Sequence, residues 1–169
     1  MKKQTLLYVW LLSLTLSGSV YAAYDGEAAG SSQRHSIPVS NDLQADAALA
    51  RKNKLPILIM FGADDCEYCE RLEEAVLNPM VVSGEYNNKI ILRKVMVEGY
   101  GSLRDFSGVS VKASEFADRY DVKVTPTVVI VDGEGKPLAP KILGLNSIDF
   151  YGAYLDQAID LSYASLRKP

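Results

Sequence analysis

Cysteine, histidine and tryptophan are scarce in this chain of 169 residues, which holds two cysteines, one histidine and one tryptophan. A structural zinc site needs about four ligands, so this supply argues against one. The histidine, His35, stands alone in a polar stretch, where we expect it only to be solvated. A c-type haem is excluded because Glu70, and not histidine, follows the second cysteine. We therefore predict no metal site and no cofactor.

The chain also lacks an excess of positive charge. Eighteen Lys and Arg residues stand against 21 Asp and Glu residues, which gives a formal net charge of −3 at pH 7. A mildly acidic protein has no electrostatic case for binding nucleic acid or anionic membranes. We expect no nucleic-acid partner, and we also expect a monomer.

The first 22 residues have the pattern of a secretory signal peptide. Lys2 and Lys3 give a positive start, Leu6–Leu16 is apolar, and Val20 and Ala22 are small residues at the −3 and −1 positions of a cleavage site. An uncleaved anchor is the alternative, but the apolar run is short for a membrane span and is broken by serine and glycine. We expect cleavage near Ala22 and a periplasmic location, which is an oxidising compartment.

The rest of the chain divides into a lead-in and one folded domain. Residues 23–40 are rich in Ala, Gly and Ser and predict a flexible segment, with a short edge strand at Ser36–Val39. The domain should cover residues 41–169. Apolar periodicity and turn residues predict helices over 41–54, 66–77 (broken or kinked at Asn78-Pro79), 81–86, 112–120 and from Ser147 onward, and strands over 55–61, 90–97, 125–131 and 137–143.

Two of these elements bear on later results. The last helix should turn its apolar side inward, with Phe150, Tyr154, Leu155, Ala158 and Leu161 facing the core. The segment Glu98–Val111 is rich in Gly and Ser and predicts a long loop of unknown role. The order of elements lets helices cover both faces of a mixed sheet, which is an α/β sandwich.

The two cysteines occur together, in Cys66-Glu67-Tyr68-Cys69, where a buried strand gives way to a helix. The orphan N–H groups of a helix N-terminus favour a thiolate at Cys66. Cys69, three residues on, lies near the same helical face and can attack a mixed disulfide. A disulfide across so small a loop would constrain the unfolded chain very little. The pattern therefore indicates reactive rather than structural cysteines.

Three stretches together resemble the thioredoxin fold over residues 41–165, and more narrowly exported thioredoxin-like reductases and the catalytic domains of periplasmic disulfide isomerases: Cys66–Glu73, Phe116–Thr127 and Val131–Lys136. The resemblance implies that Cys66 is the attacking thiolate and Cys69 the resolving thiol. It also implies that Pro126 is the family's cis-proline, which leaves the Thr125 backbone free to pair with an extended substrate segment.

The chain departs from this family at two positions beside the motif. Asp65 replaces the common tryptophan before the first cysteine, and Met60 stands where classical thioredoxins carry a buried acid. That acid helps to move the proton of the resolving cysteine, so Lys94, Glu98 or water is expected to serve as the relay here. The isomerases' dimerising domain is absent from this sequence, which puts isomerase activity in doubt.

Acidic residues crowd the motif, at Asp64, Asp65, Glu67 and Glu70. Negative charge opposes the Cys66 thiolate, and a less stable thiolate lowers the reduction potential. An acidic first turn also suits any helix, and solvent screens exposed charges. We therefore expect only a modest lowering of the reduction potential. Tyr68 could form an aromatic wall for substrate or serve as inert cover.

We therefore expect a thiol–disulfide oxidoreductase that reduces or exchanges disulfides in exported proteins and is recharged by a membrane-embedded thiol donor. A disulfide isomerase or oxidase using the same pair is the nearest alternative. A Cu(I) carrier, in which the two thiolates hold the metal, is another, although the chain has no Met-rich or His-rich companion motif. A redox-silent peptide-binding adaptor is a third, against which the retention of both cysteines argues.

Overall fold

The computed structural model describes residues 36–98 and 101–168. The predicted signal peptide, most of the predicted lead-in and His35 lie outside these residues. Within the described part, no helix has the length and apolar character needed to cross a membrane.

The core of the fold is a mixed sheet of four strands in the order β2-β1-β5-β6. The strands are β1 (Ile57–Gly62), β2 (Ile91–Met96), β5 (Thr127–Val131) and β6 (Ile142–Leu143). β1 runs parallel to β2 and antiparallel to β5, and β5 runs antiparallel to β6. All six residues of β1 and all five of β5 are buried, as expected for central strands with both faces covered.

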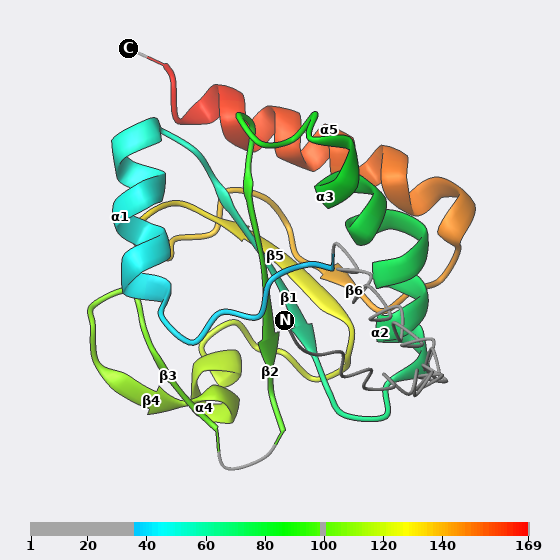
Figure 1. The fold of residues 1–169 in the computed structure, drawn as a ribbon, viewed down its shortest axis with the longest axis horizontal. Helices are drawn as coiled ribbons and strands as arrows, with labels where there is room; N and C mark the ends of the chain where they lie inside the picture. The colour runs from blue at the N-terminus through cyan, green and yellow to red at the C-terminus, as the bar shows by residue number, and fades with distance from the viewer. Residues whose placement is uncertain (1–35, 99–100, 169) are drawn as a thin grey trace, which may run out of the picture. The chain divides into compact units, whose positions relative to one another are not determined.

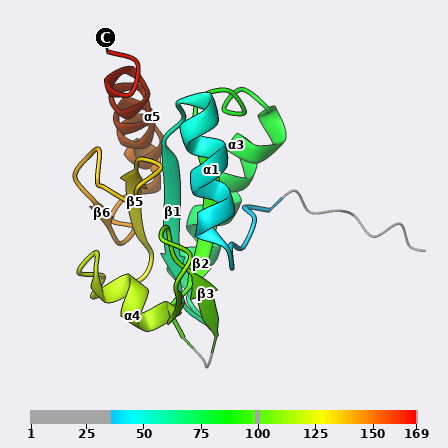
Figure 2. The same ribbon diagram turned by 90° about the vertical axis from the view of Figure 1, so that its left-hand side faces the viewer.

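Helices cover both faces of this sheet (Figures 1 and 2), which confirms the predicted α/β sandwich. Alternate residues of β1 divide between two apolar clusters, since successive side chains of a strand point to opposite faces. α1 (Leu43–Asn53) and α4 (Ala113–Asp118) pack on one face, and α2 (Glu67–Leu72), α3 (Asn78–Ser83) and α5 (Ile148–Ser165) pack on the other.

The register brings the ends of β1 and β2 and the start of β5 together at one end of the sheet. Gly62, the last residue of β1, lies opposite Met96 at the end of β2, and Phe61 lies opposite Thr127 at the start of β5. The turn that follows β1 and the loop that precedes β5 are therefore neighbours. The cysteine motif comes directly after this turn.

The sequence left open whether Asn78-Pro79 breaks or kinks the helix after the motif, and the helix does not break there. Instead a π-helical turn, η1 (Glu73–Leu77), joins α2 to α3, and the Asn78 N–H donates to the Glu73 carbonyl five residues back. Proline lacks an N–H but is tolerated in the first turn of a helix, where that group has no partner inside the helix. Pro79 occupies this position in α3. α3 then ends at Ser83, because Gly84 adopts a left-handed conformation with φ of 70°.

The prediction of a loop over Glu98–Val111 is wrong for the second half of that segment, which forms a small hairpin. β3 (Ser102–Arg104) pairs with β4 (Ser110–Lys112) in an antiparallel sheet of two strands. Asp105 makes the turn, because its carboxylate accepts the N–H groups of Ser107 and Val109, each at 2.9 Å. Because the segment is rich in Gly and Ser and each strand has only three residues, the sequence shows no apolar alternation that would predict the hairpin.

The strand predicted at Pro137–Leu143 is also shorter than expected. Only Ile142 and Leu143 pair with β5, and Pro137 forms an isolated bridge with Val131. Pro137 and Pro140 have no N–H to donate, so no continuous ladder forms, although the Leu138 N–H still donates to the Ile130 carbonyl of β5 at 2.8 Å. At the other end of the domain, Ser36–Val39 forms no strand but a single parallel bridge between Val39 and Lys94.

The prediction of which side of α5 faces the core is wrong, because the buried stripe is shifted by about one residue along the helix. Phe150, Tyr154 and Leu161 are 64%, 65% and 65% exposed, and of the predicted set Leu155 is the one that is fully buried. The buried stripe is Tyr151, Leu155, Ile159 and Ser162. Both stripes are mostly apolar at helical spacing, so the sequence did not distinguish them. Ser147 precedes the helix as predicted but makes no side-chain cap.

Candidate active site

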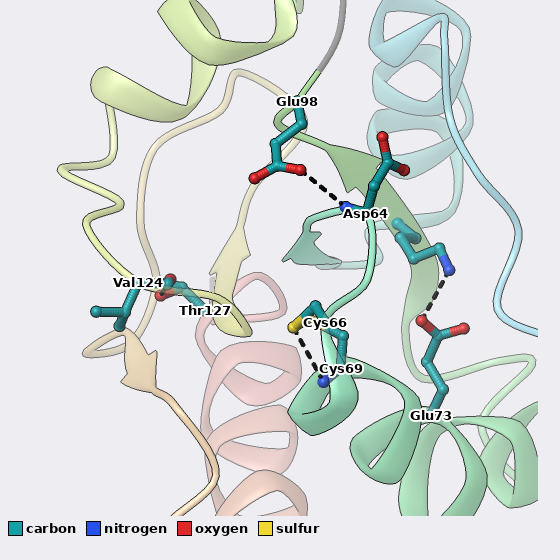
Figure 3. Close-up of a disulfide and its surroundings, with 8 residues drawn as sticks. Asp64, Cys66, Cys69, Glu73, Glu98, Val124 and Thr127 are labelled. Atoms are coloured by element: carbon teal, nitrogen blue, oxygen red, sulfur yellow. Dashed lines mark hydrogen bonds and ion pairs between the residues drawn. A yellow bond between two sulfur atoms is a disulfide. The ribbon is translucent and has the colours of Figure 1, made fainter.

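Cys66 is the N-cap residue of α2, at the end of the turn that leaves β1. Its sulfur accepts a hydrogen bond of 3.2 Å from the backbone N–H of Cys69 in the first helical turn, which also donates to the Cys66 carbonyl at 3.0 Å (Figure 3). Cys66 is partly buried, packed against the apolar cluster that contains α2 and α5. This is the arrangement that stabilises a thiolate at the first cysteine of such a pair.

Cys69 is bonded to Cys66, with an S–S distance of 2.09 Å and a Cα–Cα distance of 5.2 Å. It is only 3% exposed, whereas Cys66 remains partly accessible. Of the two sulfurs, therefore, that of Cys66 can meet a substrate and that of Cys69 faces inward. The structure brings together the two residues that the sequence placed at the centre of the chemistry.

The turn before Cys66 is fixed by two polar residues. Asp65 has φ of 53°, a left-handed conformation that Asp and Asn adopt more readily than bulky residues do. The side chain of Glu98 accepts a hydrogen bond of 3.2 Å from the Asp64 N–H (Figure 3). Of the two predicted relay residues, Glu98 thus anchors the turn.

The second loop of the site precedes β5. The peptide bond between Thr125 and Pro126 is cis. The Thr127 hydroxyl donates to the Val124 carbonyl at 2.7 Å, and the Gly144 N–H donates to the Pro126 carbonyl at 2.8 Å. Figure 3 shows Val124 and Thr127 across from Cys66.

Thr125 itself is partly buried, and none of the hydrogen bonds among residues 36–98 and 101–168 uses its backbone. An extended chain can therefore pair with it. A cleft of about 270 Å³ adjoins this loop, lined by Ala63, Glu98 and Thr125 together with residues of α4 and the 122–124 segment. Substrate atoms would have room beside the turn that carries Cys66.

The other predicted residues lie apart from this cleft. Glu67 and Tyr68 are on the first turn of α2, and both are exposed, Tyr68 by 55%. Lys94, the second predicted relay residue, projects from β2 to Glu73, with 2.7 Å between its Nζ and Glu73 Oε1. Glu73 was not predicted, although its position four residues after Cys69 on a helix would have placed it near that cysteine.

No group of three or more His, Cys, Asp or Glu side chains suited to a metal ion occurs within the described ranges. The site itself consists of one accessible sulfur at a helix N-terminus, one buried sulfur bonded to it, and a neighbouring loop with a free backbone at Thr125.

Comparison with known proteins identifies the fold. The sequence pattern of the thioredoxin-like domain family matches residues 43–159, so the chain belongs to this family. Thioredoxin O2 from Arabidopsis thaliana, in its oxidised state, is 20% identical over 73% of this chain and 95% of its own, with a TM-score of 0.50. The thioredoxin of Malassezia sympodialis is 18% identical over 77% and 93%, also with a TM-score of 0.50. These likenesses concern the fold. None of the curated protein sequences matches the chain.

Proposed function

We propose that this protein is a thiol–disulfide oxidoreductase that reduces or exchanges disulfides in exported proteins. The observation that carries the proposal is the asymmetry of the pair. Cys66 is partly exposed at a helix N-terminus, while Cys69 is 3% exposed and bonded to it. Membership of the thioredoxin-like family and the open Thr125 backbone support the same conclusion.

In the reduced protein, the Cys66 thiolate attacks one sulfur of a substrate disulfide. A bond forms between Cys66 and that sulfur, and the other substrate sulfur leaves with the electron pair and takes up a proton. The Cys69 thiolate then attacks the Cys66 sulfur, which forms the Cys66–Cys69 disulfide and releases the second substrate thiol. Two electrons pass from the protein to the substrate.

The charges around the site favour this direction. Asp64, Asp65, Glu67 and Glu70 are all exposed, and none of the ion pairs among the described residues includes them. Their negative charge opposes the Cys66 thiolate, which makes the reduced form less favoured and the protein more reducing. Solvent screens each charge, so each contribution is small.

The proposed compartment is supported by the sequence rather than by the site, and the proposed electron supply by a chemical argument. The signal-peptide pattern of residues 1–22 supports a periplasmic location. A reductant in an oxidising compartment must be recharged, and a membrane-embedded thiol donor is the class of partner that could do this. We propose that the protein acts as a monomer on disulfide-containing exported proteins.

The test is a stoichiometric transfer. The reduced protein, freed of small thiols, is mixed with a disulfide-bridged model peptide, and free thiols on each partner are counted by mass spectrometry after alkylation. We expect the peptide to gain two thiols for each Cys66–Cys69 disulfide formed, and Cys66→Ser to abolish the transfer. A wild-type protein that leaves the peptide oxidised at every ratio would contradict the proposal.

A further inference from the structure

A partly buried ion pair lies close to the cysteines and has no part in the function proposed so far. The Lys94 ammonium is 2.7 Å from the Glu73 carboxylate, and the two side chains are only 19% and 13% exposed (Figure 3). By contrast, Lys123 and Asp118 form a surface pair with side chains 67% and 71% exposed. Withdrawing two charges from water is costly, and such a pair is weak evidence for stability alone.

Glu73 lies on the same helix as Cys69, the cysteine proposed to resolve the mixed disulfide. It lies one helical turn after Cys69, and its N–H donates to the Cys69 carbonyl. Side chains four residues apart lie on one face of a helix, with about 5–6 Å between their Cβ atoms. Glu73 is also the first residue of the π-helical turn, a rare distortion that is frequent at functional sites.

Lys94 approaches the same place from the sheet. It lies opposite Met60 in the parallel pairing of β1 and β2. Both side chains converge on Gly62, where an added Cβ would lie 3.3 Å from Met60 Cε and 3.7 Å from Lys94 Cδ. Met60 and Cys69 belong to one apolar cluster. The lysine therefore passes Gly62 beside Met60, a member of the apolar cluster that contains Cys69, on its way to the Glu73 carboxylate.

The chemistry of Cys69 requires a proton acceptor. Its thiol must become a thiolate before it can attack the mixed disulfide, and at 3% exposure it has little contact with bulk water. Glu73 follows it by one helical turn, Lys94 is paired to Glu73, and the apolar Met60 of β1 belongs to the same cluster as Cys69. α5 contributes Tyr151 to the cluster, whose burial raises its pKa and keeps it neutral. Of these groups, the carboxylate is the one that can accept a proton.

We infer that the Glu73 carboxylate, held in place by Lys94, receives the proton of Cys69 during resolution of the mixed disulfide, directly or through one water molecule. This inference rests on the proposed function. The bond formed is Cys69–Cys66, the bond broken joins Cys66 to the substrate sulfur, and the electron pair leaves with that sulfur. The proton on Glu73 then passes to the departing thiolate or to solvent. Lys94 is a positioning residue, and Glu98 remains engaged with Asp64.

The resolving step can be observed alone with an aromatic disulfide that releases one coloured thiolate when Cys66 attacks it and a second when Cys69 resolves the mixed disulfide. Stopped-flow traces are recorded against pH for the wild type, Glu73→Gln and Glu73→Asp. Glu74→Gln is the matched control, because Glu74 is adjacent on the helix but exposed.

In Glu73→Gln we expect the second release at about pH 7 to be slowed by about a hundredfold or more, the lower end of general-base effects. The rate should then rise with pH and approach that of the wild type above about pH 9, where a free thiol ionises without help. The first release should be unchanged and shows that the variant is folded. Glu73→Asp, which keeps a carboxylate, should lie between the two, and Glu74→Gln should match the wild type.

Second-release profiles of Glu73→Gln and Glu73→Asp that coincide with the wild type at every pH would overturn the inference and leave the proposed function intact. A rate lowered equally at all pH values, with no recovery, would assign the pair a structural role and also overturn it. Failure of the wild type to give any second release would instead contradict the proposed function itself.

Discussion

The sulfur of Cys66 accepts a hydrogen bond of 3.2 Å from the N–H of Cys69, the residue to which it is also disulfide-bonded. The same backbone group thus supports the first cysteine as a thiolate once the bond is reduced. Cys69 is 3% exposed, whereas Cys66 is partly accessible. The unequal roles proposed for the two cysteines rest on this difference in exposure, and they can be tested.

Cys69→Ala should trap the mixed disulfide, since Cys66 can still attack but no second thiol can resolve the product. Reaction of the reduced variant with a disulfide-bridged peptide should give a stable adduct that mass spectrometry detects as the sum of the two masses. Cys66→Ala is the matched control and should give little adduct, because its remaining thiol is buried. Equal adduct yields from the two variants would contradict the assignment of roles.

Thr127→Val should loosen the loop that faces Cys66. The Thr127 hydroxyl donates to the Val124 carbonyl at 2.7 Å, and Thr127 is fully buried. Valine has nearly the same shape but leaves that carbonyl without its donor, at a cost of about 1–3 kcal/mol. Urea unfolding measures the loss of stability, and peptide-reduction rates measure the effect on the site.

Thr125→Val is the comparison for this change. Thr125 is partly exposed, and no hydrogen bond of its hydroxyl to the described residues is found. We expect its effect on stability to stay within about 0.5 kcal/mol. The interpretation of the loop fails if the two valine variants unfold at the same urea concentration.

Asp105→Asn should destabilise the hairpin that closes the second half of the 98–111 segment. Asp105 is 4% exposed and its carboxylate lies 2.7 Å from Arg119 Nη1. The amide of asparagine removes the charge that Arg119 pairs with, and we expect a loss of about 1–3 kcal/mol at neutral pH. Asp118→Asn, at an exposed ion pair of 3.8 Å, should cost less than about 0.5 kcal/mol.

The effect of Asp105→Asn should also depend on pH. The hydrogen bond from Arg119 holds the pKa of Asp105 below its usual value of 3.8. A depressed folded-state pKa contributes stability that is present above the unfolded value and is lost as the pH falls through the folded one. The difference between variant and wild type, measured by urea unfolding, should therefore be constant from neutral pH down to about pH 5 and shrink below 3.8. A difference that grows in acid would refute this account of Asp105.

Leu155→Ala and Leu161→Ala test which face of α5 is buried. Leu155 is 0% exposed and Leu161 is 65% exposed. Truncation of a buried leucine costs about 2–5 kcal/mol, whereas truncation on the surface costs about 0.5 kcal/mol or less. Thermal unfolding should thus show a large drop for Leu155→Ala and almost none for Leu161→Ala. A large drop for both variants would instead support the face that the sequence predicted, because that face includes both leucines.

The central strands and the cysteine site were predictable because their signals are local. β1 and β5 are apolar runs between turn residues, and the cysteine pair falls directly after β1. The α5 face was not predictable, because the helix carries two mostly apolar stripes and only packing against the sheet selects Tyr151, Leu155 and Ile159. Helical spacing could have placed Glu73 near Cys69, but its ion pair with Lys94 was not predictable, because Lys94 comes from a strand distant in the sequence.

The reduction potential of the Cys66–Cys69 pair tests the central claim most directly. It is measured by equilibrating the protein with glutathione or dithiothreitol buffers and following the dithiol and disulfide forms. The account predicts a value near that of thioredoxin, about −270 mV, as suits a reductant surrounded by exposed carboxylates. A value near that of a strong periplasmic oxidant, about −120 mV, would contradict it.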